Sequence, residues 1–476
     1  MPRYKPIRSL YSKSLDALKQ MLWKRAIALD HEDPCLTNRN YVVNQINEYV
    51  AKSLPSRILD ELLFFQEGTS AMYALFLLRS DIQKFKAKNI VLTKSHWEEI
   101  FTNQFQNLIV LNLSLSCTDY ILENIPKCCP HLQVLNATCR YERMRIGLNA
   151  AAFSLPVTDR GLEYLWDCQK LRVLVVNEPR SQSRGIQTSI TYAGLRKLLE
   201  HAKSIENITY SDMGSVVSKG MEHVDHLNLR AIKHFNATAE SMEEIFRLCT
   251  KLEEISLTFF ENTHQRKVLG QIIKAKPKLR CFQLIKFNCN PLVKELFEAV
   301  GEKLQILHMT EYHDPLRFCH VVCIARSCPI LRHMTLLYYS DDSKNYGKPP
   351  NFGQFTKLDT FEILCCSIDF NYMLKFCLQN CQDVLKNMTV TNYRRDSYSY
   401  VDEFFLNNFT FSQLLEVTIS ECFRFTPDNV MRLILKSDKL QYINVYSPDA
   451  YNEIPEFIKR NNFDVMFVNK TEQYLE

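Results

Sequence analysis

The chain repeats one short apolar pattern, Leu-x-x-Leu-x-Leu, along most of its length. The pattern occurs thirteen times with conservative replacements, first as LIVLNL (108–113) and last as LQYINV (440–445). Between Leu252 and Leu385 the first positions of successive copies stand 27, 25, 27, 27 and 27 residues apart. Chance does not hold such a phase, so each copy marks one structural unit of a repeat protein.

The period also predicts what each unit contains. The second half of the pattern alternates apolar and polar residues, which is typical of a short strand. Segments between the copies, such as SMEEIFRLC (241–249) and FCHVVCIARSC (318–328), have the apolar spacing of helices. One strand and one helix cannot cover their own apolar faces, whereas stacked units can. We therefore expect an α/β solenoid with a curved parallel sheet inside and helices outside.

Two further features resemble a known repeat class. Cysteine stands three residues before the first leucine at Cys129, Cys168, Cys249 and Cys328, and segments such as VTDRGLEYL (157–165) place a threonine where a helix cap is needed. The pattern resembles the cysteine-containing leucine-rich repeat, over roughly three quarters of the chain. This resemblance implies a protein-binding solenoid of the kind common in ubiquitin-ligase substrate receptors.

Composition excludes several classes of function. The net charge is only +5, with 58 basic and 53 acidic residues interspersed, so we expect no nucleic-acid partner. No apolar stretch is long enough for a bilayer, and the 17 cysteines lack disulfide-module spacing. The expected location is therefore cytoplasmic, nuclear or both, with no membrane partner. Only 11 glycines occur, without a phosphate-binding loop, so no cofactor is expected.

Catalytic and metal chemistry are also not expected. No nucleophile or metalloprotease signature occurs, and repeat solenoids usually provide binding surfaces. The segment HMTEYHDPLRFCHVVCIARSC (308–328) gathers three His and three Cys without a tight CxxC pair. Cys319 and Cys323 fall on one expected helix, where buried cysteine acts as a small apolar residue. We expect these residues to fill the structure and not to bind zinc.

The polar position inside each Leu-x-Leu core predicts a binding surface on the concave side of the sheet. Residues inserted after the strands, at 138–156, 177–189, 337–354 and 391–403, are expected on one rim. The segment YRRDSYSY (393–400) is rich in the residue types of contact hot spots. A merely solvated face and drifting loops remain the alternative. The residues expected to bind a protein substrate are Asn228, Ser256, Gln283, His308, Thr335, Glu362, Thr389, Tyr393, Arg394 and Arg395.

The chain divides by pattern into a helical segment, 1–106, and a solenoid with a C-terminal cap, 107–476. In the helical segment, SLYSKSLDAL (9–18) is similar to the elongin-binding box, with Leu10, Ser14 and Leu18 in its places. The family prefers Cys where this chain has Ser14. LPSRIL (54–59) looks like the cullin-contacting box, with Leu54, Pro55 and Ile58 in its places, after a longer gap than the family has.

Both boxes ahead of the repeats resemble the von Hippel–Lindau-box substrate receptors of cullin-RING ubiquitin ligases. The resemblance implies elongin B/C and a cullin as partners, besides a protein substrate. Residues 54–95 also resemble an F-box, which implies a Skp-type adaptor. A third alternative is that 1–106 only caps the solenoid, which is then a protein-interaction scaffold outside any ligase.

Overall fold

The computed structural model confirms the predicted architecture, an α/β solenoid of leucine-rich repeats with parallel strands. It falls into two compact units, each considered by itself. The N-terminal unit contains Arg8–Lys233 and Arg247–Lys251, and the C-terminal unit contains His234–Phe246 and Leu252–Glu476. The structure describes residues 10–31, 53–64, 77, 79, 81–86, 97–98, 100–101, 105–114, 116–138, 157–176, 190–259, 262–288, 292–311, 318–339, 355–365, 376–392, 410–420, 427–445 and 453–468.

In the N-terminal unit, short strands alternate with helices, and the paired strands follow chain order. β6 and α10 contain residues of both units. The elements are α1 (Leu10–His31), α3 (Ser56–Phe64), β1 (Lys84–Lys86), β2 (Val110–Asn112), α6 (Asp119–Cys128), β3 (Val134–Asn136), α7 (Asp159–Tyr164), η4 (Leu165–Asp167), β4 (Val173–Val175), α8 (Tyr192–His201), β5 (Asn207–Thr209), α9 (Met213–Val217) and β6 (Ala231–Phe235).

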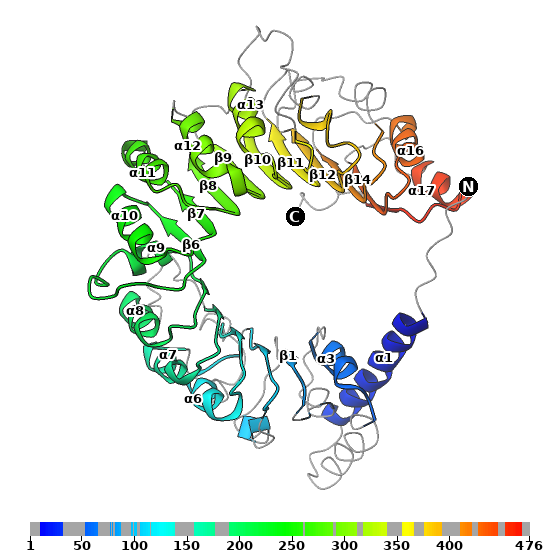
Figure 1. Ribbon diagram of the computed structural model, residues 1–476. Helices are drawn as coiled ribbons and strands as arrows, with labels where there is room; N and C mark the ends of the chain where they lie inside the picture. The colour runs from blue at the N-terminus through cyan, green and yellow to red at the C-terminus, as the bar shows by residue number, and fades with distance from the viewer. Residues whose placement is uncertain are drawn as a thin grey trace. The chain divides into compact units, whose positions relative to one another are not determined.

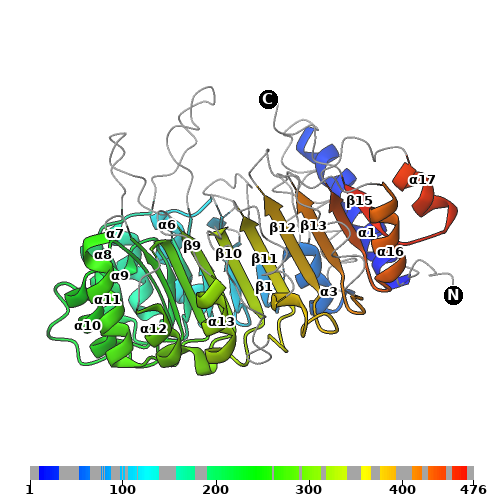
Figure 2. The ribbon, with the colours of Figure 1, turned by 90° about the horizontal axis from the view of Figure 1, so that it is seen from above.

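In the C-terminal unit strands and helices alternate up to β10, while between β10 and β13 only residues 376–378 are helical among those described. The helices of this unit lie along one side of its strands (Figures 1 and 2). Where the sequence predicts the C-terminal cap, the chain forms a helix at 453–460 and a strand at 466–468. The elements are α10 (Ala239–Leu248), β7 (Glu254–Thr258), α11 (Asn262–Ala275), β8 (Cys281–Phe287), α12 (Val293–Val300), η6 (Gly301–Lys303), β9 (Ile306–Glu311), α13 (Phe318–Ser327), β10 (His333–Tyr339), β11 (Thr360–Cys365), β12 (Asn387–Asn392), β13 (Glu416–Ser420), α16 (Pro427–Lys436), β14 (Tyr442–Val445), α17 (Glu453–Arg460) and β15 (Met466–Val468).

One of the thirteen predicted strands is misplaced. VDHLNL (224–229) forms no strand; the strand of this repeat is β6, and Ala231 pairs with Asn207 of β5. The repeat therefore begins at Leu229, five residues later than predicted. The misplacement has a physical reason: Val224, Leu227 and Leu229 are all buried, so the apolar spacing fits both positions.

The sheet also begins earlier than the first recognised repeat. β1 lies within 1–106 and pairs in parallel with β2. Asp60 of α3 fixes this start, because its Oδ1 accepts hydrogen bonds from the backbone N–H groups of Gln83, at 2.8 Å, and Lys84, at 3.0 Å. α3 packs through Leu59, Leu62 and Leu63, which are fully buried.

Successive helices of the N-terminal unit are joined by a recurring aspartate–threonine contact. Asp119, the first residue of α6, accepts hydrogen bonds from the N–H of Thr158, at 2.8 Å, and from its hydroxyl, at 2.5 Å. Asp159 of α7 does the same for Thr191, at 2.8 and 2.7 Å. A Cβ at Gly161 would come within 2.1 Å of the Asp119 carboxylate, so a larger residue there would displace this carboxylate.

Replacing Asp159 by alanine is expected to lower the free energy of unfolding of the N-terminal unit by roughly 1–2 kcal/mol, because it removes both hydrogen bonds to Thr191. Glu163→Ala, at an exposed position of the same helix, is the control, with an expected change within about 0.5 kcal/mol. Chemical denaturation followed by circular dichroism measures both. Equal effects of the two substitutions would contradict the role given to Asp159.

Candidate binding surfaces

The predicted substrate-contacting row lines up in the C-terminal unit. Ser256, Gln283, His308, Thr335, Glu362 and Thr389 stand opposite one another on β7 to β12. The register therefore agrees with the sequence. Most of these side chains are half-buried, and Thr335 is only 5% exposed, so none of the six is fully open to solvent.

The middle of the row is joined by polar and ring contacts. The Thr335 hydroxyl donates to Glu362 Oε2 at 3.1 Å, and His333 Nε2 lies 3.2 Å from the same hydroxyl. The rings of His308 and His333 lie 4.8 Å apart. Ser256 donates to Gln283 Oε1 at 2.9 Å. This surface offers hydrogen-bonding groups, among them the Glu362 carboxylate, at positions set by the strand register.

The two histidines predict a pH dependence. Burial lowers the pKa of His308, with His333 adding to the effect and Glu362 opposing it. Burial likewise lowers the pKa of His333, with Glu362 and Asp359 opposing it. As the pH falls, these histidines take up protons in the unfolded chain before they do so in the folded chain. The folded state therefore has its full stability above the ordinary histidine pKa of 6.5 and loses stability as the pH falls below it.

Hydrogen–deuterium exchange of β9 and β10 at pH 7.5 and 5.5 checks this expectation, with faster exchange at pH 5.5 after correction for intrinsic rates. The His308→Gln/His333→Gln double variant is expected to lose that difference. A variant that keeps the full difference would show that other groups cause it.

Other predicted substrate contacts lie elsewhere. Asn228 stands in the connection before β6, where its Nδ2 donates to the Lys203 carbonyl at 2.8 Å. The register position on β6 that corresponds to the row is Lys233. Tyr393, Arg394 and Arg395 lie outside the described residues, as do most residues of the four insertions.

The predicted adaptor-binding residues occupy two helix starts. Leu10 begins α1, Ser14 is exposed and Leu18 is half-buried. On the same face, Ala17 is exposed and Met21 is 56% exposed. Leu22, beside this face, is only 2% exposed, so this part of the helix packs against the protein.

Leu54, Pro55 and Ile58 lie at the start of α3. The Pro55 carbonyl accepts from the N–H of Ile58, at 2.9 Å, and of Leu59, at 3.2 Å, which begins the helix. Arg79 donates to the Leu54 carbonyl at 2.8 Å. Pro55 is exposed, and Leu54 and Ile58 are half-buried.

The repeat cysteines belong to the core. Cys129, Cys168, Cys249 and Cys328 are buried, and all have free thiols. Burial raises the pKa of Cys168, Cys249 and Cys328 to about 12, so these thiols stay protonated at neutral pH. Protonated buried thiols are poor nucleophiles and poor metal ligands.

Among the described residues, no group of three or more His, Cys, Asp or Glu side chains could hold a metal ion. None of the helices in the described part of the chain is both long and apolar enough to cross a membrane.

Sequence reasoning missed a polar groove of about 410 Å³ in the N-terminal unit. Its lining comes from residues just before β3, β4 and β5 and from the connections before β6 and β7. Three cations and one carboxylate line it: Lys170, Arg172, Lys251 and Glu206. Its neutral lining residues are Gln133, Gln169, Ser204 and Asn228.

Backbone pairing sets the spacing of this groove. The Arg172 N–H donates to the Gln133 carbonyl at 2.8 Å, and the Glu206 N–H donates to the Arg172 carbonyl at 2.8 Å. These residues hold the same place in successive repeats, immediately before the strand. Their side chains therefore stand side by side along the edge of the sheet.

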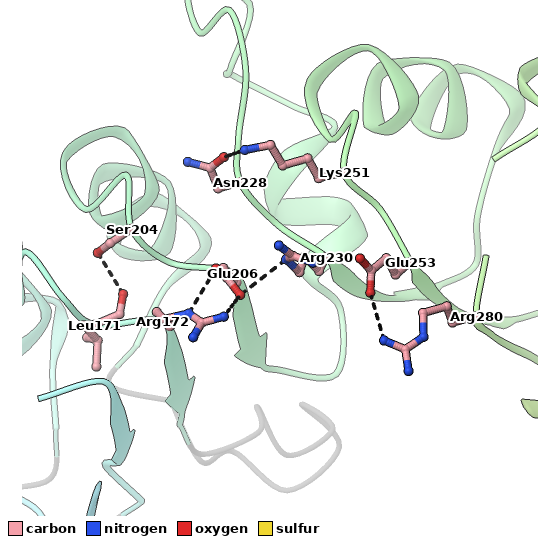
Figure 3. A network of polar contacts seen from close by, with 9 residues as sticks. All are labelled: Leu171, Arg172, Ser204, Glu206, Asn228, Arg230, Lys251, Glu253 and Arg280. Atoms are coloured by element: carbon pink, nitrogen blue, oxygen red, sulfur yellow. Dashed lines mark hydrogen bonds and ion pairs between the residues drawn. The ribbon is translucent and has the colours of Figure 1, made fainter. Parts of the chain in front are cut away.

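Ion pairs orient the charged residues (Figure 3). Arg172 donates to both oxygens of Glu206, from Nε at 3.0 Å and from Nη2 at 2.7 Å. Arg230 Nε lies 3.3 Å from Glu206 Oε2. The Arg172 hydrogen bond lowers the pKa of Glu206, which keeps the carboxylate ionised. In the C-terminal unit the same arrangement recurs with Arg280 and Glu253, at 3.6 Å.

A sequence signal for this edge exists. A lysine directly precedes the first apolar position in six repeats, and all six side chains are exposed. The six are Lys170, Lys251, Lys278, Lys303, Lys357 and Lys439. These six lysines stand before the strands, so the polar positions within the strands, which predict the concave row, do not include them.

No protein-family model and no curated protein matches the chain. Solved structures do match, among them the Rad7 and Elc1 complex in yeast. That match has 10% sequence identity, a TM-score of 0.38, and covers 97% of this chain and 98% of the other. The leucine-rich repeat solenoid is shown by the chain's own parallel strand pairing, independently of this likeness.

Proposed function

We propose that this protein is a substrate receptor of a cullin-RING ubiquitin ligase. α1 binds elongin B/C, the start of α3 contacts the cullin, and the repeat surface holds a protein substrate. The receptor itself makes or breaks no covalent bond. Its contribution is to hold a substrate lysine near the ubiquitin-charged enzyme, which raises the effective concentration of the two reactants.

The observation that carries the proposal is the exposed stripe on α1. Ser14, Ala17 and Met21 are spaced three and four apart, so they share one helix face, and all three are exposed. Met21 is one of the few large apolar side chains in the described residues that stay open to solvent. Ser14 is both a member of this stripe and the middle place of the elongin-binding box, and Leu18, which takes the last place of the box, borders the stripe and is half-buried. This overlap is why elongin is the chosen partner.

The start of α3 supports the cullin contact and also the F-box alternative. Pro55 is exposed, while Leu59 and Leu63, one helical turn apart, anchor the helix in the core. The accessible side chains at this helix start are therefore available to either a cullin or a Skp-type adaptor. Only the α1 stripe separates the two readings, because the F-box leaves it without a role.

A pulldown from cell lysate, probed for elongin C and for a Skp-type adaptor, tests the proposal. The intact chain should retain elongin C, and Ser14→Glu/Met21→Glu should abolish retention. Asp16→Lys/Gln20→Lys, on the polar face of the same helix, is the matched control and should retain it. Circular dichroism confirms that each variant is folded.

Three outcomes would decide against it. If the Skp-type adaptor binds and Pro55→Glu/Ile58→Glu alone removes it, the chain is an F-box protein. If neither adaptor binds, the solenoid is a scaffold without a ligase link. If both α1 variants bind elongin C equally, the stripe is not the docking site.

A further inference from the structure

We propose that the polar groove lined by Lys170, Arg172, Glu206 and Lys251 binds a phosphorylated serine or threonine of a protein partner. The inference rests on the proposed function in one respect, since it names the substrate class of the receptor. It does not depend on which adaptor α1 binds.

The first argument is charge. Lys170, Arg172 and Lys251 face one carboxylate, Glu206, so the lining carries a net charge of +2. A phosphorylated side chain carries about −1.5 to −2 at neutral pH, which matches that excess. A single carboxylate from an acidic side chain would neutralise only half of it.

The second argument is that the cations are positioned with donors to spare. Lys251 Nζ donates to Asn228 Oδ1 at 2.8 Å, and Lys170 Nζ lies 2.8 Å from His131 Nδ1. Each contact holds the ammonium group in place and uses one of its three donors at most. Glu206 holds Arg172 through Nε and Nη2. The cations are thus fixed before a ligand arrives, which reduces the entropy lost on binding.

The third argument concerns Glu206, which by itself would repel a phosphate. Its two oxygens are already engaged by Arg172, and Oε2 also lies beside Arg230. A carboxylate paired in this way acts as a support for the guanidinium and presents little free negative charge to the groove.

The lining also distinguishes a protein partner from nucleic acid. Single-stranded nucleic acid is held by aromatic side chains that stack on its bases, together with cations. None of the eight residues that line the groove is aromatic. A space of about 410 Å³ accommodates a phosphorylated side chain with its neighbours, and the polar amides can hydrogen-bond an extended backbone.

The test applies the purified full chain to a degenerate peptide array in which the fixed central residue is phosphoserine, phosphothreonine, serine or glutamate. At about 0.15 M salt we expect at least a ten-fold preference for the phosphorylated peptides. Lys170→Ala/Lys251→Ala should remove that preference, and Lys170→Arg/Lys251→Arg should keep it. Lys278→Ala/Lys303→Ala is the matched control, because these exposed lysines hold the same repeat position outside the groove.

Equal retention of serine and phosphoserine peptides would overturn the proposal, and so would equal retention of glutamate peptides. Retention of single-stranded RNA in place of phosphopeptides would assign the groove to nucleic acid. An unchanged preference in the Lys170→Ala/Lys251→Ala variant would place the site elsewhere. None of these results bears on adaptor binding, so this inference and the ligase proposal fail separately.

Discussion

Replacing Phe282 by alanine is expected to lower the free energy of unfolding of the C-terminal unit by roughly 3–5 kcal/mol. Phe282 lies on β8, has no exposed surface, and stands opposite Ile255 of β7 and Leu307 of β9, which are buried as well. Truncation leaves a cavity that these neighbours cannot fill, because the strand spacing is fixed by backbone hydrogen bonds. Guanidinium denaturation followed by circular dichroism measures the loss.

Phe235→Ala provides the matched aromatic control. Phe235 is 38% exposed, so its removal is expected to have less than half the effect. If the two substitutions lower the free energy of unfolding equally, the buried face of the sheet that contains Phe282 is not the main source of stability in this unit.

Replacing Gly301 by alanine is expected to destabilise the same unit by roughly 1–3 kcal/mol. A Cβ at this position would lie 2.4 Å from the backbone oxygen of Ser327, at the end of α13, and 2.9 Å from Cys328 Sγ. A backbone oxygen held by a helix cannot move aside as a flexible side chain can. The close approach of η6 to α13 therefore requires glycine.

The opposite sign is expected for Gly270→Ala, which is the matched control. Gly270 lies within α11, is exposed, and has nothing within 4 Å of an added Cβ. Alanine should stabilise the helix there by about 1 kcal/mol, through its higher helix propensity. Loss of stability in both variants would contradict the contact assigned to Gly301.

The sequence predicted the strands well because their apolar residues are fixed by a single requirement. In each repeat the residues that become Leu-x-Leu must fill one slot of a continuous core, so twelve of the thirteen strands lie where the pattern places them. The failure at 224–229 follows from the same cause. Val224, Leu227 and Leu229 all enter the core, and the apolar pattern alone cannot separate a buried connection from a strand.

Polar contacts between repeats were less predictable. Thr158 stands at the expected helix start, but its hydroxyl donates to Asp119 of the preceding repeat and makes no cap bond to its own helix. Thr191 caps α8 as expected, by accepting from the Gly194 N–H at 3.1 Å. The Thr191 hydroxyl also donates to Asp159 of the preceding repeat, at 2.7 Å. Both threonines therefore make the contact between repeats, and the local sequence does not show which of them also caps its own helix.

The groove was missed for a related reason. Its charged residues stand before β4, before β5 and, for Lys251, before β7, so they come from different repeats and meet only through the stacking of those repeats. Each of them, taken alone, looks like an ordinary solvated residue beside a leucine. The pattern also predicts Asn228 on a strand, whereas it lies in the connection before β6 and accepts a hydrogen bond from Lys251.

Titration of the immobilised full chain with purified elongin B/C measures whether α1 binds elongin. We expect saturable one-to-one binding with a Kd of about 1 μM or tighter. Ser14→Cys, which restores the residue that the box family prefers, should bind at least as tightly, and Ser14→Glu/Met21→Glu should not bind. If neither the intact chain nor the Ser14→Cys variant binds at about 50-fold higher concentrations, α1 is not an elongin-binding helix.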